Sequence, residues 1–380
     1  MKRVHLVIPD LFLPKDIAAE VCADLRLPAL EKLLGKGRSE TLQAASLENL
    51  LCEFFGLSCG ADAPIASISA AFDGLGEGCW LRADPVHLRL QRDQMLLTGV
   101  TPVSDEGMQF CASLNEYFSV QGIEFFAPHP QRWYVRLAAL PRIRTTPLSE
   151  VLGGNVRNAL PTGEDAAHWH QLFNEIQMLM YAHPLNDARE ARSELPVNSV
   201  WFWGGGCDTL LAKPDDCGNS RQAAPKVPEE ESVPSCGSGH SAFYSQKKYV
   251  YINSDEPLVE MFAAAAAIPF AAWPEQWSES LNLALTHMEK RPSSDGMQLL
   301  VWTGLRSALQ RGDLAAWRAA LQDFEVGYAQ QLWQALNSGK LKQLQLDIPG
   351  EHGIRRVQLN RSDTWAFWRA AKRLAEYSMV

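Results

Sequence analysis

The residues best suited to chemistry gather between residues 183 and 206, in the stretch HPLNDAREARSELPVNSVWFWGGG. Its polar part contains His183, Asn186, Asp187, Arg189 and Arg192. Arginine side chains can hold an anionic group through paired, charge-assisted hydrogen bonds, so a specific binding site is one interpretation. The other is a helix end, a surface loop and a core strand that ends in a flexible glycine turn. Residue types alone leave both open.

The elements around this segment would have to position it and any partner residues. Residues 4 to 9 are a short apolar run that ends beside Asp10, as a buried parallel strand delivers a side chain to the carboxyl edge of a sheet. Ser46 precedes SLENLLCEFFG and is placed to cap a helix that Gly56 would end. The sequence therefore predicts a strand end at Asp10 and a helix start at Ser46.

The order of predicted elements indicates an α/β fold with a second domain. At 380 residues the chain has room for more than one domain. We expect a core from residues 1–80 and 183–380 and a smaller inserted α+β domain from residues 81–182. Strands are predicted at 4–9, 78–90, 123–126, 133–137, 197–203, 248–253, 297–303, 341–348 and 354–359. Helices are predicted at 28–35, 46–56, 106–117, 165–182, 256–267, 313–337 and 363–377.

Four aromatic residues of the longest predicted helix could suggest a ligand wall: Trp317, Phe324, Tyr328 and Trp333. Side chains that recur at helical spacing are more often packed in a core. We therefore expect these rings to be core residues.

Composition narrows the range of partners. The formal net charge is -9 and no window gathers basic residues into a stripe, which argues against a nucleic-acid partner. The apolar start is interrupted by Pro9 and Asp10, and the apolar run from Leu258 to Trp273 is too short for a membrane span. We expect a cytoplasmic protein with no membrane partner.

The eight cysteines lack the short paired spacings of a zinc ribbon or a redox motif, so reduced structural thiols are expected. The nearest approach to a metal set is Cys207, Cys217, Cys236 and His240, and its irregular spacing disfavours zinc. Most of that set lies in a tract at 213–241 that is rich in Pro, Gly, Ser and acidic residues. This tract is expected to be a mobile loop.

The segment from His183 resembles a known family. His-Pro-x-Asn-x-x-Arg followed by Pro-Val-Asn and a strand ending in glycines is similar to the archaeal-type branch of cofactor-independent phosphoglycerate mutases. The resemblance implies an alkaline phosphatase-like core, with a mostly parallel sheet flanked by helices, and an inserted α+β domain. It also implies that Arg82, Asn186, Arg189 and Asn198 bind the substrate.

The same resemblance implies a phosphoserine mechanism at two divalent metal ions. Ser46 lies near the position of the family's nucleophile, and Asp10 and Asp347 match two of its metal ligands. Two adjacent cations need several carboxylates and imidazoles to offset their charge.

The carboxyl-terminal half departs from the family pattern. Residues 305–310 supply no carboxylate or histidine where the family has a cluster of both, and only Asp347 remains of the second cluster. The leading hypothesis is therefore a non-catalytic relative without a metal cofactor. It would act in regulation or by binding a phosphorylated or anionic ligand, as the RpfE-type bacterial regulatory proteins that it resembles suggest.

Two alternatives remain. The first is an active mutase or phosphatase with a rearranged set, Asp10, Ser46, Asp347 and His352, that uses Mn, Mg or Zn. The second is an interaction scaffold whose tract at 213–241 contacts a protein partner.

Overall fold

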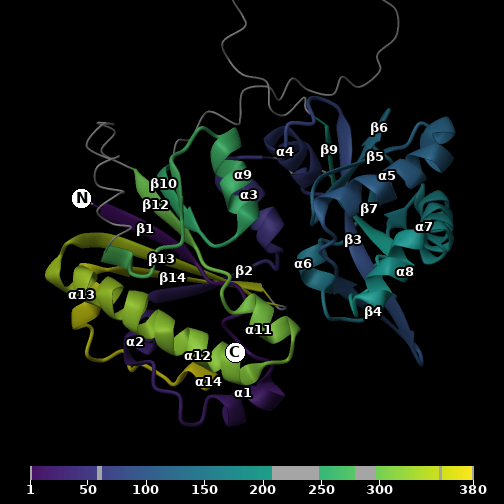
Figure 1. Ribbon diagram of the computed structural model, residues 1–380. Coiled ribbons are helices and arrows are strands. Elements are labelled where there is room, and N and C mark those ends of the chain that lie inside the picture. Colours follow the sequence, from purple (N-terminus) through teal and green to yellow (C-terminus); the bar gives the residue numbers. More distant parts are fainter. Residues whose placement is uncertain (1, 58–61, 208–247, 279–295, 351–352, 379–380) are drawn as a thin grey trace, which may run out of the picture.

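The computed structural model describes residues 2–57, 62–207, 248–278, 296–350 and 353–378. The larger lobe is built on a seven-stranded sheet in the order β11-β10-β12-β1-β13-β14-β2 (Figure 1). Its strands are β1 (Lys2–Val7), β2 (Arg38–Leu42), β10 (Tyr249–Ser254), β11 (Phe270–Ala272), β12 (Met297–Val301), β13 (Leu341–Gly350) and β14 (Gly353–Asn360). The five strands from β11 to β13 pair in parallel, whereas β14 and β2 pair antiparallel.

Helices cover both faces of this sheet, which explains why its central strands are apolar almost throughout. One face carries α2 (Pro28–Lys36), α12 (Leu314–Phe324) and α13 (Gln330–Ser338), and the other carries α3 (Leu47–Phe55) and α9 (Pro257–Ala265) (Figure 1). Leu6 of β1 packs toward the first group, and Val7 packs toward the second. Adjacent residues of one strand thus serve two separate cores.

The smaller lobe holds an antiparallel sheet in the order β4-β3-β6-β5, and β9 pairs with β3 (Figure 1). Its strands are β3 (Cys79–Gln91), β4 (Gln94–Gly99), β5 (Glu124–His129), β6 (Arg132–Leu137) and β9 (Ser199–Cys207). Helices α4 (Ile65–Phe72), α5 (Ser104–Phe118), α7 (Ala166–Tyr181) and α8 (Pro184–Ala191) surround it. The boundary expected at residue 183 stays a prediction, although β9, which follows it, pairs in this second sheet.

The α/β prediction is confirmed, and the described elements follow the expected order except at the carboxyl end. Elements that the sequence did not predict include α1 (Lys15–Val21), α4, α6 (Leu148–Val151), α8, α11 (Arg306–Gln310), β2, β7 (Ile143–Arg144) and β8 (Thr162–Gly163). The long helix is present as α12 and α13, joined by a π-helical turn, η4 (Glu325–Ala329). Trp317, Phe324 and Tyr328 are buried core residues, as expected, and Trp333 is partly buried against the same cluster.

The predicted final helix at residues 363–377 is wrong. The chain instead forms a short 3₁₀ turn, η5 (Arg361–Trp365), an irregular stretch and a four-residue helix, α14 (Leu374–Tyr377). The Lys36 ammonium donates a 2.8 Å hydrogen bond to the Ala366 carbonyl and another to the Arg369 carbonyl. Contacts from another part of the chain therefore occupy carbonyls that a continuous helix would use internally.

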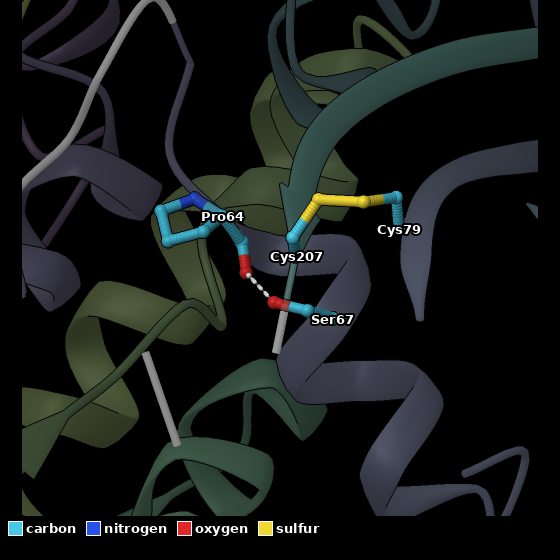
Figure 2. The surroundings of a disulfide bond; sticks show 4 residues. All are labelled: Pro64, Ser67, Cys79 and Cys207. Carbon is cyan, nitrogen blue, oxygen red and sulfur yellow. Dashed lines mark hydrogen bonds between the residues drawn. A yellow bond between two sulfur atoms is a disulfide. The ribbon is translucent and has the colours of Figure 1, made fainter. Parts of the chain in front are cut away.

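A disulfide joins Cys79, at the start of β3, to Cys207, at the end of β9, with a Cα–Cα distance of 4.2 Å (Figure 2). The expectation of reduced thiols is thus wrong for this pair. Cys22, Cys52 and Cys111 are buried.

Close packing surrounds this bridge, where Ser67 of α4 donates a 3.1 Å hydrogen bond to the Pro64 carbonyl (Figure 2). A Cβ on Gly206 would lie 2.7 Å from Ser67 Oγ, so glycine lets β9 approach α4. Of the disfavoured zinc set, Cys207 is bound in the disulfide, and Cys217, Cys236 and His240 lie outside the described residues, as does the tract at 213–241.

Within the ranges that the structure describes, no helix has the length and apolar character needed to cross a membrane.

Candidate functional site

Ser46 lines a cleft of about 270 Å³ where the two lobes meet. The larger lobe contributes the start of α3, with Ser46 and Glu48, and the smaller lobe contributes Arg144 and Glu150. Trp203 of β9 completes the wall. The cleft thus combines residues that lie far apart in the sequence.

Ser46 caps helix α3, as the sequence predicted. Its backbone is extended, and its hydroxyl accepts a 3.1 Å hydrogen bond from the Asn49 backbone N–H. Gly56 closes the helix in the left-handed conformation that glycine adopts without a Cβ clash. The predicted catalytic role of Ser46 stays a prediction, because capping explains the residue without chemistry.

Carboxylates outnumber cations among the described residues that line the cleft. Glu48 is buried and its Oε1 accepts a 2.7 Å hydrogen bond from the Ser149 hydroxyl. Asp62 accepts a 2.9 Å hydrogen bond from the Thr145 backbone N–H. Burial raises the pKa of Asp62, and burial together with the nearby Glu48 charge raises the pKa of Glu150.

Asp10 lies beyond the end of β1, in a left-handed conformation with φ of 63°. Its Oδ2 accepts a 3.1 Å hydrogen bond from Arg306 Nε, and Arg306 Nη1 lies 3.9 Å from Glu256 Oε2. Burial alone would lower the pKa of Arg306, but the charges of Asp10, Glu48 and Glu256 raise it. Arg306 thus places one fixed positive charge among three carboxylates.

Asp347 of β13 is fully buried and forms a bidentate pair with Arg356 of β14. His5 Nε2 lies 2.9 Å from Asp347 Oδ2, and His5 Nδ1 lies 2.6 Å from the Tyr249 hydroxyl. Burial alone would raise the pKa of Asp347, but hydrogen bonds from Arg356 and His5 lower it to about 2. Burial also lowers the pKa of His5, which favours the neutral imidazole, and a tautomer with the proton on Nε2 would donate to Asp347 and accept from Tyr249.

The two carboxylates that were predicted as metal ligands therefore have separate arginine partners. Among the described residues, no hydrogen bond or ion pair joins Asp10, Ser46 and Asp347 to one another, and no group of three His, Cys, Asp or Glu side chains is placed to hold a metal ion. His352 lies outside the described residues. The donors within the described ranges do not fit a site for two metal ions, which needs several carboxylates and imidazoles.

Arg82, a predicted substrate residue, is engaged inside the smaller lobe. Its Nη2 lies 2.7 Å from Asp84 Oδ1, and its guanidinium lies over the rings of Tyr134 and Trp203. Both members of the ion pair are almost fully buried. An anion would have to displace Asp84 to reach this guanidinium.

The other three predicted substrate residues hold α8 and β9 in place. Asn186 is buried and hydrogen-bonds the backbone of Met180 and both backbone groups of Val197. Arg189 is buried and pairs with Glu106 of α5. Asn198 hydrogen-bonds both backbone groups of Leu88 at 2.7 and 2.8 Å. Their predicted substrate role stays a prediction, since each has a structural role in this lobe.

Sequence reasoning missed Arg306, Arg356, His5 and Tyr249. A signal for Arg356 was present, because the strands predicted at 341–348 and 354–359 are close enough in the sequence to form a hairpin, and the hairpin sets Asp347 opposite Arg356. Arg306 lies in the stretch from which the expected metal ligands are missing. An arginine where the family has carboxylates and a histidine indicated that the charge of the site differs from that of the family.

Comparisons with known proteins identify distant relatives. The chain is 27% identical to a 2,3-bisphosphoglycerate-independent phosphoglycerate mutase of Methanosarcina mazei over 107 residues, which are 27% of this chain and 26% of that protein. A probable enzyme of the same description from Geobacter sulfurreducens is 33% identical over 60 residues, which are 16% of this chain and 15% of that protein. These matches thus span about a quarter or less of the relatives' length. No family model matches.

Two solved structures resemble the whole chain. The PH0037 protein of Pyrococcus horikoshii matches with a TM-score of 0.52 and 12% identity over 99% of this chain and 93% of that one. A cofactor-independent phosphoglycerate mutase of Thermoplasma acidophilum matches with a TM-score of 0.47, also at 12% identity, over 99% of this chain and 94% of that one. The likeness to the Pyrococcus horikoshii protein shows a shared fold.

The fold and the cleft define an α/β protein in which a mostly parallel sheet and a separate antiparallel sheet meet at a polar site. Over about a quarter of its length, this chain is a distant relative of 2,3-bisphosphoglycerate-independent phosphoglycerate mutases.

Proposed function

We propose that this chain is a non-catalytic relative of the phosphoglycerate mutases, comparable to the RpfE-type regulatory proteins, and that it acts by binding a ligand in the cleft beside Ser46. The observation that carries the proposal is the bidentate pair between Asp347 and Arg356. A guanidinium that occupies both carboxylate oxygens leaves them poorly placed for a metal ion and already offsets their charge.

The environment of Asp10 supports the same proposal. Arg306 adds a positive charge beside Asp10, Glu48 and Glu256, where a metal-dependent relative would need further anionic ligands. The fixed positive charge of Arg306 repels a divalent ion, and it offsets the negative charge of the carboxylates that such an ion would otherwise offset. Metal-dependent formation of a phosphoserine would lack its main source of electrostatic stabilisation.

The cleft itself favours a particular kind of anionic ligand. Arg144 is the cation among the described lining residues, while Glu48, Asp62 and Glu150 are hydrogen-bond acceptors when ionised. A small monoanion with several hydroxyl groups fits this distribution, because Arg144 can take its charge and the carboxylates can accept from its hydroxyls. A ligand with several negative charges fits poorly.

A mutase and phosphatase assay on the full chain tests the proposal. With manganese, magnesium or zinc present, we expect no interconversion of 2- and 3-phosphoglycerate and no hydrolysis of a phosphate monoester. Ser46→Ala is the matched control, since it removes the hydroxyl and leaves the fold. Metal-dependent turnover that disappears in Ser46→Ala would overturn the proposal.

A further inference from the structure

A short segment near the carboxyl end displays three large aromatic side chains to solvent. Trp365, Phe367 and Trp368 are 67%, 87% and 71% exposed. The Phe367 and Trp368 rings contact each other with centroids 5.1 Å apart. Exposing neighbouring rings of this size is unfavourable in water, so such a group marks an interaction surface more often than a single exposed ring does.

Hydrogen bonds to a distant part of the chain anchor the backbone of this segment. The Lys36 ammonium binds the carbonyls of Ala366 and Arg369, and Arg369 donates a 2.7 Å hydrogen bond back to the Lys36 carbonyl. Ala366, between the aromatic residues, is buried. These contacts anchor the backbone while the rings on either side of Ala366 point outward.

Basic residues accompany the rings. From residue 361 to residue 373 the sequence has one acid, Asp363, and four basic residues: Arg361, Arg369, Lys372 and Arg373. Arg369 lies 3.2 Å from Asp363 and Arg373 lies 3.6 Å from Glu31, so the excess positive charge of the segment rests mainly on Arg361 and Lys372, in a chain whose net charge is -9. Arg361 lies 5.8 Å from the centre of the Trp365 ring, so charge and aromatic surface are adjacent.

We propose that residues 361–373 form a docking surface for an anionic phospholipid bilayer. Tryptophan and phenylalanine insert at the boundary between headgroups and acyl chains, and arginine and lysine pair with lipid phosphates. A nucleic acid would need a longer basic track than this segment offers. This proposal replaces the expectation of no membrane partner, and the absence of a spanning helix among the described residues does not bear on a peripheral contact of this kind.

Vesicle co-sedimentation of the full chain tests the proposal. We expect binding to mixed phosphatidylcholine and phosphatidylglycerol vesicles, several-fold weaker binding to phosphatidylcholine alone, and loss of binding as salt is raised. A Phe367→Ser/Trp368→Ser double variant should bind at least about tenfold less tightly. Lys372→Glu should weaken binding to the anionic vesicles. Tyr181→Ala, which removes a ring that is 84% exposed on the other lobe, should leave binding unchanged.

Several results would overturn the proposal. One is no binding to anionic vesicles, and another is equal binding to both kinds of vesicle. If the double variant instead abolishes self-association of the chain without lipid, the surface belongs to a second copy. If a single-stranded oligonucleotide competes away the vesicles, the partner is a nucleic acid. Circular dichroism of each variant shows whether it is folded. If the double variant is unfolded, vesicle binding by Lys372→Glu alone tests the proposal.

Discussion

Asp347 and Arg356 lie directly opposite each other on β13 and β14, and Arg356 Nε and Nη2 donate hydrogen bonds of 2.8 and 2.7 Å to the two carboxylate oxygens of Asp347. The Asp347 side chain is fully shielded from solvent. Under the proposed function, this pair occupies the position that the resemblance to the mutases assigns to a metal-binding carboxylate. The effect of removing the Arg356 guanidinium on stability can be measured.

Arg356→Ala should lower the free energy of unfolding by about 3–5 kcal/mol, because it leaves a buried carboxylate without its main partner. Urea denaturation at neutral pH measures this. Arg38→Ala, which removes an exposed arginine from β2, should change stability by about 0.5 kcal/mol or less. Equal stability of the two variants would contradict the structural role of the pair.

The acid limb of the stability curve gives a second readout of the same pair. The folded-state pKa of Asp347 is lowered from 3.8 to about 2, so its contribution is fully present above the unfolded value and is lost as the pH falls from 3.8 toward 2. Arg356→Ala should flatten the stability curve in that window. An unchanged slope would show that Asp347 keeps its low pKa without Arg356.

Arg306→Gln should destabilise the protein more at high pH than at low pH. Without this guanidinium, Asp10, Glu48 and Glu256 lose a shared cation, and the pKa of Glu256, already raised by burial, should rise further. A raised folded-state pKa gives stability that is lost as the pH increases through it. Thermal unfolding at about pH 5 and about pH 8 tests this, and a pH-independent loss would contradict it.

Ser46→Ala should lower the free energy of unfolding by about 1 kcal/mol, because the Asn49 backbone N–H loses its acceptor. Ser46→Asp is the matched variant, since aspartate also caps helices and should retain most of the stability. Denaturation curves of the three proteins separate the cap from any catalytic role. If Ser46→Ala is as stable as the parent chain, the cap does not explain why serine occurs here.

Reduction of the Cys79–Cys207 disulfide should lower the free energy of unfolding by about 2–4 kcal/mol, because the bridge closes a loop of 128 residues in the unfolded chain. Thiol titration before and after reduction should show two additional thiols from this pair. In the double variant Cys79→Ser/Cys207→Ser, reductant should not lower the free energy of unfolding through loss of this bridge. An oxidised parent chain whose stability equals that of the double variant would contradict the prediction.

The sequence was sufficient where local patterns decide the structure. Ser46 and Gly56 delimit α3 as expected, because helix caps depend on residues within one turn. The buried run of β1 likewise followed from apolar residues alone. Such features need no knowledge of distant partners.

Features that depend on distant contacts were missed. The disulfide requires β3 and β9 to pair across 128 residues, and the failed helix at the carboxyl end depends on Lys36, which lies 330 residues from Ala366. The resemblance to mutases placed Asp10 and Asp347 at a site, but it carried no information on Arg306 and Arg356. Whether a carboxylate is free or paired is decided by the assembled sheet.

Calorimetric titration of the metal-free full chain with Mn²⁺ tests the central claim most directly, because it asks whether the carboxylates beside Arg306 and Arg356 are available to a metal ion. We expect no saturable binding in the micromolar range, and no change when Asp347→Asn is titrated in parallel. Tight binding of two ions per chain that Asp347→Asn weakens would contradict it.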